Sequence, residues 1–170
     1  MIRRASQRGF GLVEATLATV IAGGVIVVGI NSIASAVVIK RKAAERERAR
    51  LLAVDLVTEA LRLPYEDPVQ GVGAVPGPGA DEVTGTRSMF DDVDDYHGWT
   101  SSPPQYKDGA TMSGLTGWRR TLAVRRVDPG TLATSASDTG VIEITVTVER
   151  HGAELARVVA LRTSSWDVTP

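Results

Sequence analysis

The N-terminal part of the chain carries a long, almost unbroken run of apolar residues. Residues 10–39 read FGLVEATLATVIAGGVIVVGINSIASAVVI, and no charged residue occurs between Ala15 and Ile39. About 20 apolar residues are enough to cross the hydrocarbon core of a bilayer as a helix. Core helices of soluble proteins are seldom so long and so apolar on every side, so the pattern predicts a segment that spans a membrane or directs the chain to one.

After this run the helical pattern continues and becomes amphipathic. In 40–63 the apolar residues fall on one side and the polar residues on the other, which predicts a solvated stripe. Pro64 ends the pattern, because a proline disfavours the helical conformation of the residue before it. We therefore expect one helix over about 10–63. The polar stripe consists of Asp55, Thr58, Glu59 and Arg62.

The C-terminal part shows the alternation that is typical of strands. Residues 141–149 (VIEITVTVE) alternate apolar and polar side chains, a turn follows at 150–153, and 155–163 supplies a partner strand. A further strand is expected at 118–127. Its arginines alternate with apolar residues and are expected on its solvated face: Arg119, Arg120, Arg125 and Arg126. The pattern predicts an antiparallel sheet of three or more strands over about 117–163.

The segment between helix and sheet, 64–116, is rich in glycine and proline and is expected to form a long irregular loop. It contains MFDDVDDYHGW at 89–99, whose carboxylates are the oxygen ligands that calcium favours. The glycine and glutamate of an EF-hand loop are missing, so a solvated acidic turn is the favoured interpretation. The weak candidate metal ligands are Asp91, Asp92, Asp94 and Asp95.

Charge and motifs narrow the possible functions. The net charge is −1 and becomes −4 without residues 1–9, which hold three arginines, so the chain is a poor candidate for binding nucleic acid. The absence of cysteine excludes disulfides and thiolate chemistry. No nucleophile elbow, phosphate loop or zinc-binding helix motif occurs, and surface positions are expected for His97 and His151. We expect no enzyme activity.

The apolar run admits several interpretations. A secretory signal peptide would be cut at the A-x-A site Ala34-Ser35-Ala36 and would release a chain that begins at Val37. Against this, the run is longer than the apolar region of most signal peptides and contains Glu14. An uncleaved signal anchor is the second possibility. The three arginines of residues 1–9 favour a cytoplasmic N-terminus.

A third interpretation comes from the order of residues before the span. A short basic leader, then Gly9, Phe10, Leu12 and Glu14, resembles the cleavage signal of the type IV prepilin family, which includes the type II secretion pseudopilins. The resemblance implies cleavage between Gly9 and Phe10 by prepilin peptidase and N-methylation of Phe10. It covers residues 1 to about 40 firmly and the remainder loosely. Residues 89–99 are also similar to a segment of minor pilins of mannose-sensitive haemagglutinin pili, which favours a minor subunit.

Glu14 is the most informative residue of this signal. A carboxylate within an apolar span costs on the order of several kcal/mol unless it finds a partner. The resemblance implies that Glu14, with Leu12 beside it, acts in assembly by pairing with the amino terminus of a neighbouring subunit. The alternative is a glutamate that reaches the headgroup region from near the end of the helix.

The resemblance also implies an architecture and a location. The fold would be a pilin-like α+β roll, in which 10–39 forms the transmembrane and assembly half-helix and 40–63 packs on the sheet of an extracytoplasmic domain, 64–170. The chain would enter the bacterial inner membrane and then a periplasmic pseudopilus or a surface pilus. Its partners would be other subunits and the inner-membrane assembly platform, with no cofactor required. The alternative function is a membrane-tethered module that binds a ligand, surface or calcium through 64–116.

Overall fold

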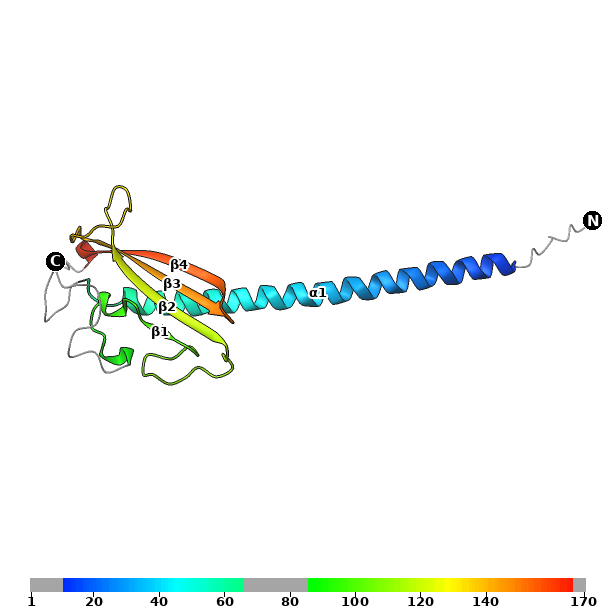
Figure 1. The fold of residues 1–170 in the computed structure, drawn as a ribbon, viewed down its shortest axis with the longest axis horizontal. Helices are drawn as coiled ribbons and strands as arrows, with labels where there is room; N and C mark the ends of the chain where they lie inside the picture. Colours follow the sequence, from blue (N-terminus) through cyan, green and yellow to red (C-terminus); the bar gives the residue numbers. More distant parts are fainter. Residues whose placement is uncertain (1–10, 66–85, 167–170) are drawn as a thin grey trace, which may run out of the picture. The chain divides into compact units, whose positions relative to one another are not determined.

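The computed structural model describes residues 11–65 and 86–166. The chain divides into two compact units, Met1–Ala44 and Glu45–Pro170, and each is described by itself. The predicted α+β fold is confirmed: a long N-terminal helix is followed by an antiparallel sheet, and the second half of the helix packs on that sheet (Figure 1).

Helix α1 extends over Leu12–Leu61 and therefore includes both the apolar and the amphipathic part of the predicted helix. It ends two residues before the expected boundary, where the Leu63 N–H donates to the Ala60 carbonyl at 3.1 Å and the helical turn tightens. Pro64 follows directly, as the sequence predicted. The expected first residue of the helix, Phe10, lies outside the described residues.

The sheet has the strand order β1-β2-β3-β4, and every neighbouring pair is antiparallel (Figure 1). The two-residue turn His151-Gly152 joins β3 to β4, and both residues have positive φ angles, 51° and 80°. The three strands predicted from the sequence are thus confirmed, and β1 adds a short fourth one. The strands are β1 (Thr100–Ser101), β2 (Trp118–Arg126), β3 (Val141–Arg150) and β4 (Ala153–Thr163).

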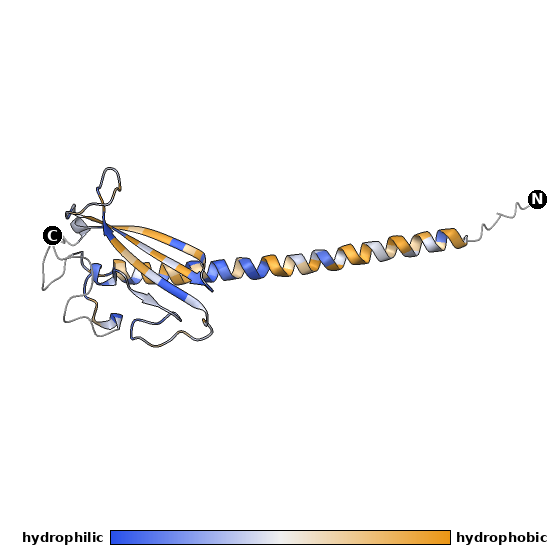
Figure 2. Ribbon diagram, viewed as in Figure 1, coloured by the Kyte–Doolittle hydropathy of each residue, from blue (hydrophilic) through white to orange (hydrophobic). Residues whose placement is uncertain are grey.

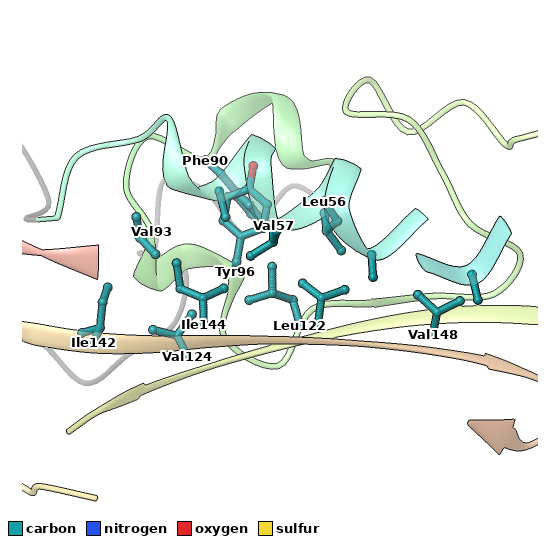
Figure 3. Packing of buried hydrophobic residues seen from close by; sticks show 14 of the residues in the cluster. Leu56, Val57, Phe90, Val93, Tyr96, Leu122, Val124, Ile142, Ile144 and Val148 are labelled. Carbon is teal, nitrogen blue, oxygen red and sulfur yellow. The ribbon is translucent and has the colours of Figure 1, made fainter. Parts of the chain in front are cut away.

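The core of the second unit lies between α1 and one face of the sheet. The apolar positions of β3 that alternate in the sequence are all buried, and they face buried residues of α1 such as Leu56 and Val57 (Figure 3). Small residues such as Ala49 and Ala53, both fully buried, let the helix approach the sheet closely. The alternating apolar residues of the strand and the apolar residues of α1 therefore pack against each other, as predicted. The buried β3 residues are Ile142, Ile144, Val146 and Val148.

The described part of the expected loop, residues 86–116, is more ordered than the prediction. It forms two short 3-10 helices, η1 (Arg87–Met89) and η2 (Asp94–Tyr96), before β1. Val93 and Tyr96 are completely buried, and the Tyr96 ring meets that of Phe90 edge to face with centroids 5.0 Å apart (Figure 3). This segment contributes side chains to the core. The glycine and proline content, which predicted an irregular loop, did not indicate this.

The prediction that all four arginines of β2 lie on a solvated face is wrong for Arg120. Its side chain is fully buried, whereas Arg119 is exposed. Consecutive residues of a strand point to opposite faces, so Arg120 must share the face of Trp118 and Leu122, which is the core face. A buried guanidinium requires partners, and the structure supplies them from α1 and from the 86–116 segment.

Candidate functional site

The apolar half of α1 presents large hydrophobic side chains that nothing covers within the described part of its unit. Leu12 is 82% exposed, Val20 72% and Ile33 68%, and none of the helix's most apolar stretch is buried. Figure 2 shows that this half of the helix is mainly hydrophobic. The length and composition of α1 are sufficient for one passage through a membrane. This helix is compatible with a membrane anchor, and it is the feature most unlike the surface of an ordinary soluble domain.

The hydroxyl groups in this apolar half are satisfied within the helix. The hydroxyls of Thr16, Ser32 and Ser35 each donate to a carbonyl one turn earlier, at 2.9 Å. Thr19 makes the same bond to the Ala15 carbonyl. Such bonds leave no hydroxyl in need of water, which is the condition that a lipid environment imposes on polar groups.

Glu14 lies in the first turn of α1, where a negative charge is favourable beside the free N–H groups of the helix end. Its Oε2 accepts the N–H of Gly11 at 3.3 Å, and its side chain is exposed, as is that of Leu12. No ion pair within the part of the chain that the structure describes includes Glu14. The carboxylate is therefore available to a cation from elsewhere. Gly9 and Phe10, the predicted processing site, lie outside the described residues.

A buried ionic cluster in the second unit was not predicted from the sequence. Arg87 is 2% exposed and binds Glu59 of α1 through two nitrogens, with Nε 2.9 Å from Oε1 and Nη2 3.3 Å from Oε2. The Tyr96 hydroxyl donates to the same Oε1 at 2.9 Å. Burial acts to raise the pKa of Glu59, but the bonds and charge of Arg87 outweigh it and leave the pKa below its ordinary value.

Arg120 completes this cluster from β2. It donates to Asp55 Oδ2 and to the Leu52 carbonyl, each at 3.3 Å, and both Arg120 and Arg87 donate to the Gln105 carbonyl. Burial, followed by the charge of Arg87, lowers the pKa of Arg120. The guanidinium of Arg87 also lies 4.2 Å from the ring centroid of Trp99. The cluster thus joins α1, the 86–116 segment and β2.

The acidic segment is not the solvated turn that the sequence favoured. Asp92 and Asp95 are 1% and 2% exposed, because each carboxylate accepts main-chain N–H groups of the turn. Asp92 Oδ1 accepts from Asp94 at 2.7 Å and from Asp95 at 3.2 Å, and Asp95 Oδ2 accepts from Asp91 at 3.0 Å. These bonds give the two buried carboxylates a structural role at the start of η2.

The same carboxylates were the weak candidates for a calcium site. Ligand oxygens of Asp91, Asp92 and Asp95 lie within 4.8 Å of one another, and Asp94 is not part of this group. Burial, with the bond and charge of Asp94 and the charge of Asp95, raises the pKa of Asp92 to about 8. The bonds to main-chain N–H groups account for the burial of Asp92 and Asp95, so the geometry supports the structural role.

Both histidines are exposed as expected, but His97 has a specific partner: its Nδ1 accepts the N–H of Val124 at 3.2 Å.

A polar cleft of about 380 Å³ lies over the last turns of α1. The stripe predicted to be solvated forms most of its wall, but the Glu59 side chain in this wall is only 19% exposed. Helical spacing located the stripe, whereas nothing in the sequence indicated that Arg87 or Lys107 would meet it. The cleft is lined by Asp55, Thr58, Glu59, Arg62, Leu63 and Lys107.

Comparisons with known proteins do not assign the chain to a family. No family model, no curated protein and no solved structure matches the chain. The functional interpretation therefore depends on the N-terminal segment and on the fold. The two predicted assembly residues, Leu12 and Glu14, are both exposed in the first turn of α1.

Proposed function

We propose that the chain is a structural subunit, a minor pilin or pseudopilin, that is assembled into a type IV pilus or a type II secretion pseudopilus. Prepilin peptidase would cut it between Gly9 and Phe10 and methylate the new amino terminus. The observation that carries the proposal is the bare apolar half of α1, which continues as the same helix into a half packed on the sheet. A discarded signal has no need of such a continuation.

The signal-peptide alternative is less well supported. Its A-x-A site, 34–36, lies inside α1, and proteases bind their substrates in extended form, so cleavage there would require this part of the helix to unwind. Cleavage would also leave a short helix of mixed charge before the first core residue, Ala49. Cleavage after Gly9 leaves the whole helix intact, and a glycine fits readily into the extended backbone that a protease cleft needs.

Glu14 would provide the polar contact in an otherwise apolar assembly surface. Its carboxylate has one weak intrahelical bond and no cation among the described residues. In lipid such a group gains several kcal/mol from a charged partner, at the scale of the cost of an unpaired carboxylate. The new amino terminus of a neighbouring subunit, at Phe10, is the partner we propose, because a stagger of about 6 Å between neighbouring helices, the rise of four residues, would bring it level with Glu14.

The location follows from this assignment. The subunit would first lie in the bacterial inner membrane with its leader in the cytoplasm and the second unit on the other side. The assembly platform of that membrane and other subunits would then be its partners. The alternative of a tethered binding module is less favoured, because the described part of 64–116 directs Val93 and Tyr96 into the core.

Incorporation into filaments tests the proposal. Cells that carry the cognate assembly genes would express the full chain or its Glu14→Leu variant, and the sheared filament fraction would be compared with the membrane fraction. We expect the variant to be processed, to stay in the membrane and to fall at least tenfold in filaments. The Thr19→Val variant, which alters a satisfied hydroxyl nearby, should be incorporated like the natural chain. Equal incorporation of the Glu14→Leu variant would contradict the proposed role of Glu14.

A further inference from the structure

A basic cluster follows directly after the apolar run of α1. It consists of Lys40, Arg41 and Lys42, and all three side chains are exposed. Within the described ranges 11–65 and 86–166, no ion pair includes any of them. The nearest acidic residue in the sequence, Glu45, forms an ion pair with Arg150 of β3. The three positive charges therefore have no anionic partner among the described residues.

The length of the apolar run determines the depth of this cluster in a membrane. A helix rises about 1.5 Å per residue, so Lys40 lies about 37 Å along the axis from Ala15, the residue after Glu14. The hydrocarbon core of a bilayer is about 30 Å thick, and each headgroup layer adds about 5–7 Å. For a helix that enters the core at Ala15, a tilt of about 20° shortens the distance by about 2 Å. The basic cluster then lies in the headgroup layer on the far side.

The position of the basic cluster does not follow from membrane topology. Lysine and arginine near a span normally gather on its cytoplasmic side. The leader arginines Arg3, Arg4 and Arg8 obey this rule, whereas 40–42 lies at the opposite end of the span. The proposed cleavage would remove the leader arginines and keep the basic cluster. At the depth of this cluster the available anions are the phosphates of lipids.

We propose that the basic cluster, 40–42, binds the headgroup phosphates of anionic phospholipids in the leaflet opposite the leader. The inference rests on the membrane anchor of the proposed function. Lysine and arginine at the surface attract anionic headgroups such as phosphatidylglycerol. Arg41 can donate two parallel hydrogen bonds to one phosphate, and the lysines act as point charges. Consecutive helical residues lie about 100° apart around the axis, so the three side chains can contact more than one headgroup.

The lipid selectivity of the full chain in vesicles tests this inference. The chain would be reconstituted in phosphatidylcholine vesicles with a trace of phosphatidylglycerol or phosphatidylcholine that carries a nitroxide on its acyl chain. Electron paramagnetic resonance then compares the association of the two labelled lipids with the protein. We expect phosphatidylglycerol to associate at least about threefold more strongly. The preference should fall by half or more in the cluster variant, Lys40→Gln, Arg41→Gln, Lys42→Gln.

Two controls separate the basic cluster from charge in general. A sheet variant removes the same charge from exposed side chains and should keep the full preference: Arg119→Gln, Arg125→Gln, Arg157→Gln. A charge-preserving variant of the cluster should also keep it: Lys40→Arg, Arg41→Lys, Lys42→Arg. The leader arginines are present in every variant, so a difference between variants comes from the substituted residues. Circular dichroism would show that each variant retains its helix.

Four results would overturn the inference. They are equal association of the two lipids with the natural chain, an unchanged preference in the cluster variant, an equal fall in the sheet variant, and a fall in the charge-preserving variant. A natural chain that stays outside the vesicles would contradict both the membrane anchor and this inference. A chain that prefers phosphatidylglycerol and fails to enter filaments contradicts the proposed function alone. A chain that enters filaments without this preference contradicts the lipid inference alone.

Discussion

Arg87 binds Glu59 from a distant part of the sequence, with the Arg87 Nε 2.9 Å from Glu59 Oε1. Arg87 belongs to the segment between helix and sheet, and Glu59 belongs to the amphipathic half of α1. Tyr96 donates to the same carboxylate, so one side chain of α1 holds two points of the 86–116 segment. This contact attaches the described part of the loop, 86–116, to the helix.

We expect Arg87→Met to lower the free energy of unfolding by about 3 kcal/mol, because it leaves Glu59 without its cation in a largely buried position. Urea unfolding of the full chain in detergent, followed by tryptophan fluorescence, would measure the change. The control is Arg125→Met, which removes an ion pair to Glu143 from an exposed site and should have little effect. Similar decreases in the free energy of unfolding in the two variants would contradict a larger contribution of the Arg87–Glu59 contact to stability.

The pKa of Asp92 predicts a dependence of stability on pH. It is raised from 3.8 to about 8, so between these values the folded chain binds a proton that the unfolded chain has lost. The contribution of Asp92 is therefore complete below about pH 4, falls as the pH rises toward 8 and is absent above that. In Asp92→Asn this decline should disappear, because an amide does not titrate in this range. The amide oxygen can still accept the N–H of Asp94, which keeps the turn intact. Unfolding at several pH values would measure it.

Asp128 serves as the control for that experiment, because its shift has the opposite sign. Its bonds from Thr131 and Gly130 lower the pKa, so its contribution to stability is present at neutral pH and is lost on acidification below about pH 4. Asp128→Asn should therefore leave the slope between pH 4 and 8 unchanged. A persistent slope in the Asp92→Asn variant would contradict the assignment of that titration.

Gly117 is predicted to tolerate no side chain. Its φ angle is +78°, and an added Cβ would lie 2.8 Å from His151 Nδ1 in the turn between β3 and β4. The left-handed conformation alone should cost Gly117→Ala roughly 1–2 kcal/mol, and the contact with the imidazole adds to this. Adding His151→Gly should recover part of the loss, which thermal unfolding can measure. Gly98→Ala, at φ +75° with open space around it, should lose less.

The sequence was most informative where one physical requirement acts along a whole element. Strand alternation located β3 and its buried Ile144, and helical spacing placed Leu56 and Ala60 in the core, because burial on one face repeats every two residues or every turn. The turn between β3 and β4 was also located, although β4 begins at Ala153, two residues before the predicted strand. The apolar half of α1 could be predicted equally well, because a long run of apolar residues identifies it without any distant contact.

The sequence was least informative where a contact joins distant residues. Arg120 could have been placed on the core face by its alternation with Leu122, but its charge suggested the opposite. Its partner Asp55 is 65 residues away in the sequence. The burial of Asp92 depends on local bonds to main-chain N–H groups, which composition does not indicate. The candidate residue Glu14 was identified by its position in a motif, and the structure adds only its exposure and its lack of a cation among the described residues.

The mass and sequence of the mature N-terminus test the central claim most directly. The full chain would be expressed with and without prepilin peptidase, purified from membranes and analysed by Edman degradation and mass spectrometry. Our account predicts a chain that begins at N-methylated Phe10 when the peptidase is present and the intact leader when it is absent. A mature chain that begins at Val37, or one that keeps residues 1–9 in the presence of the peptidase, would contradict it.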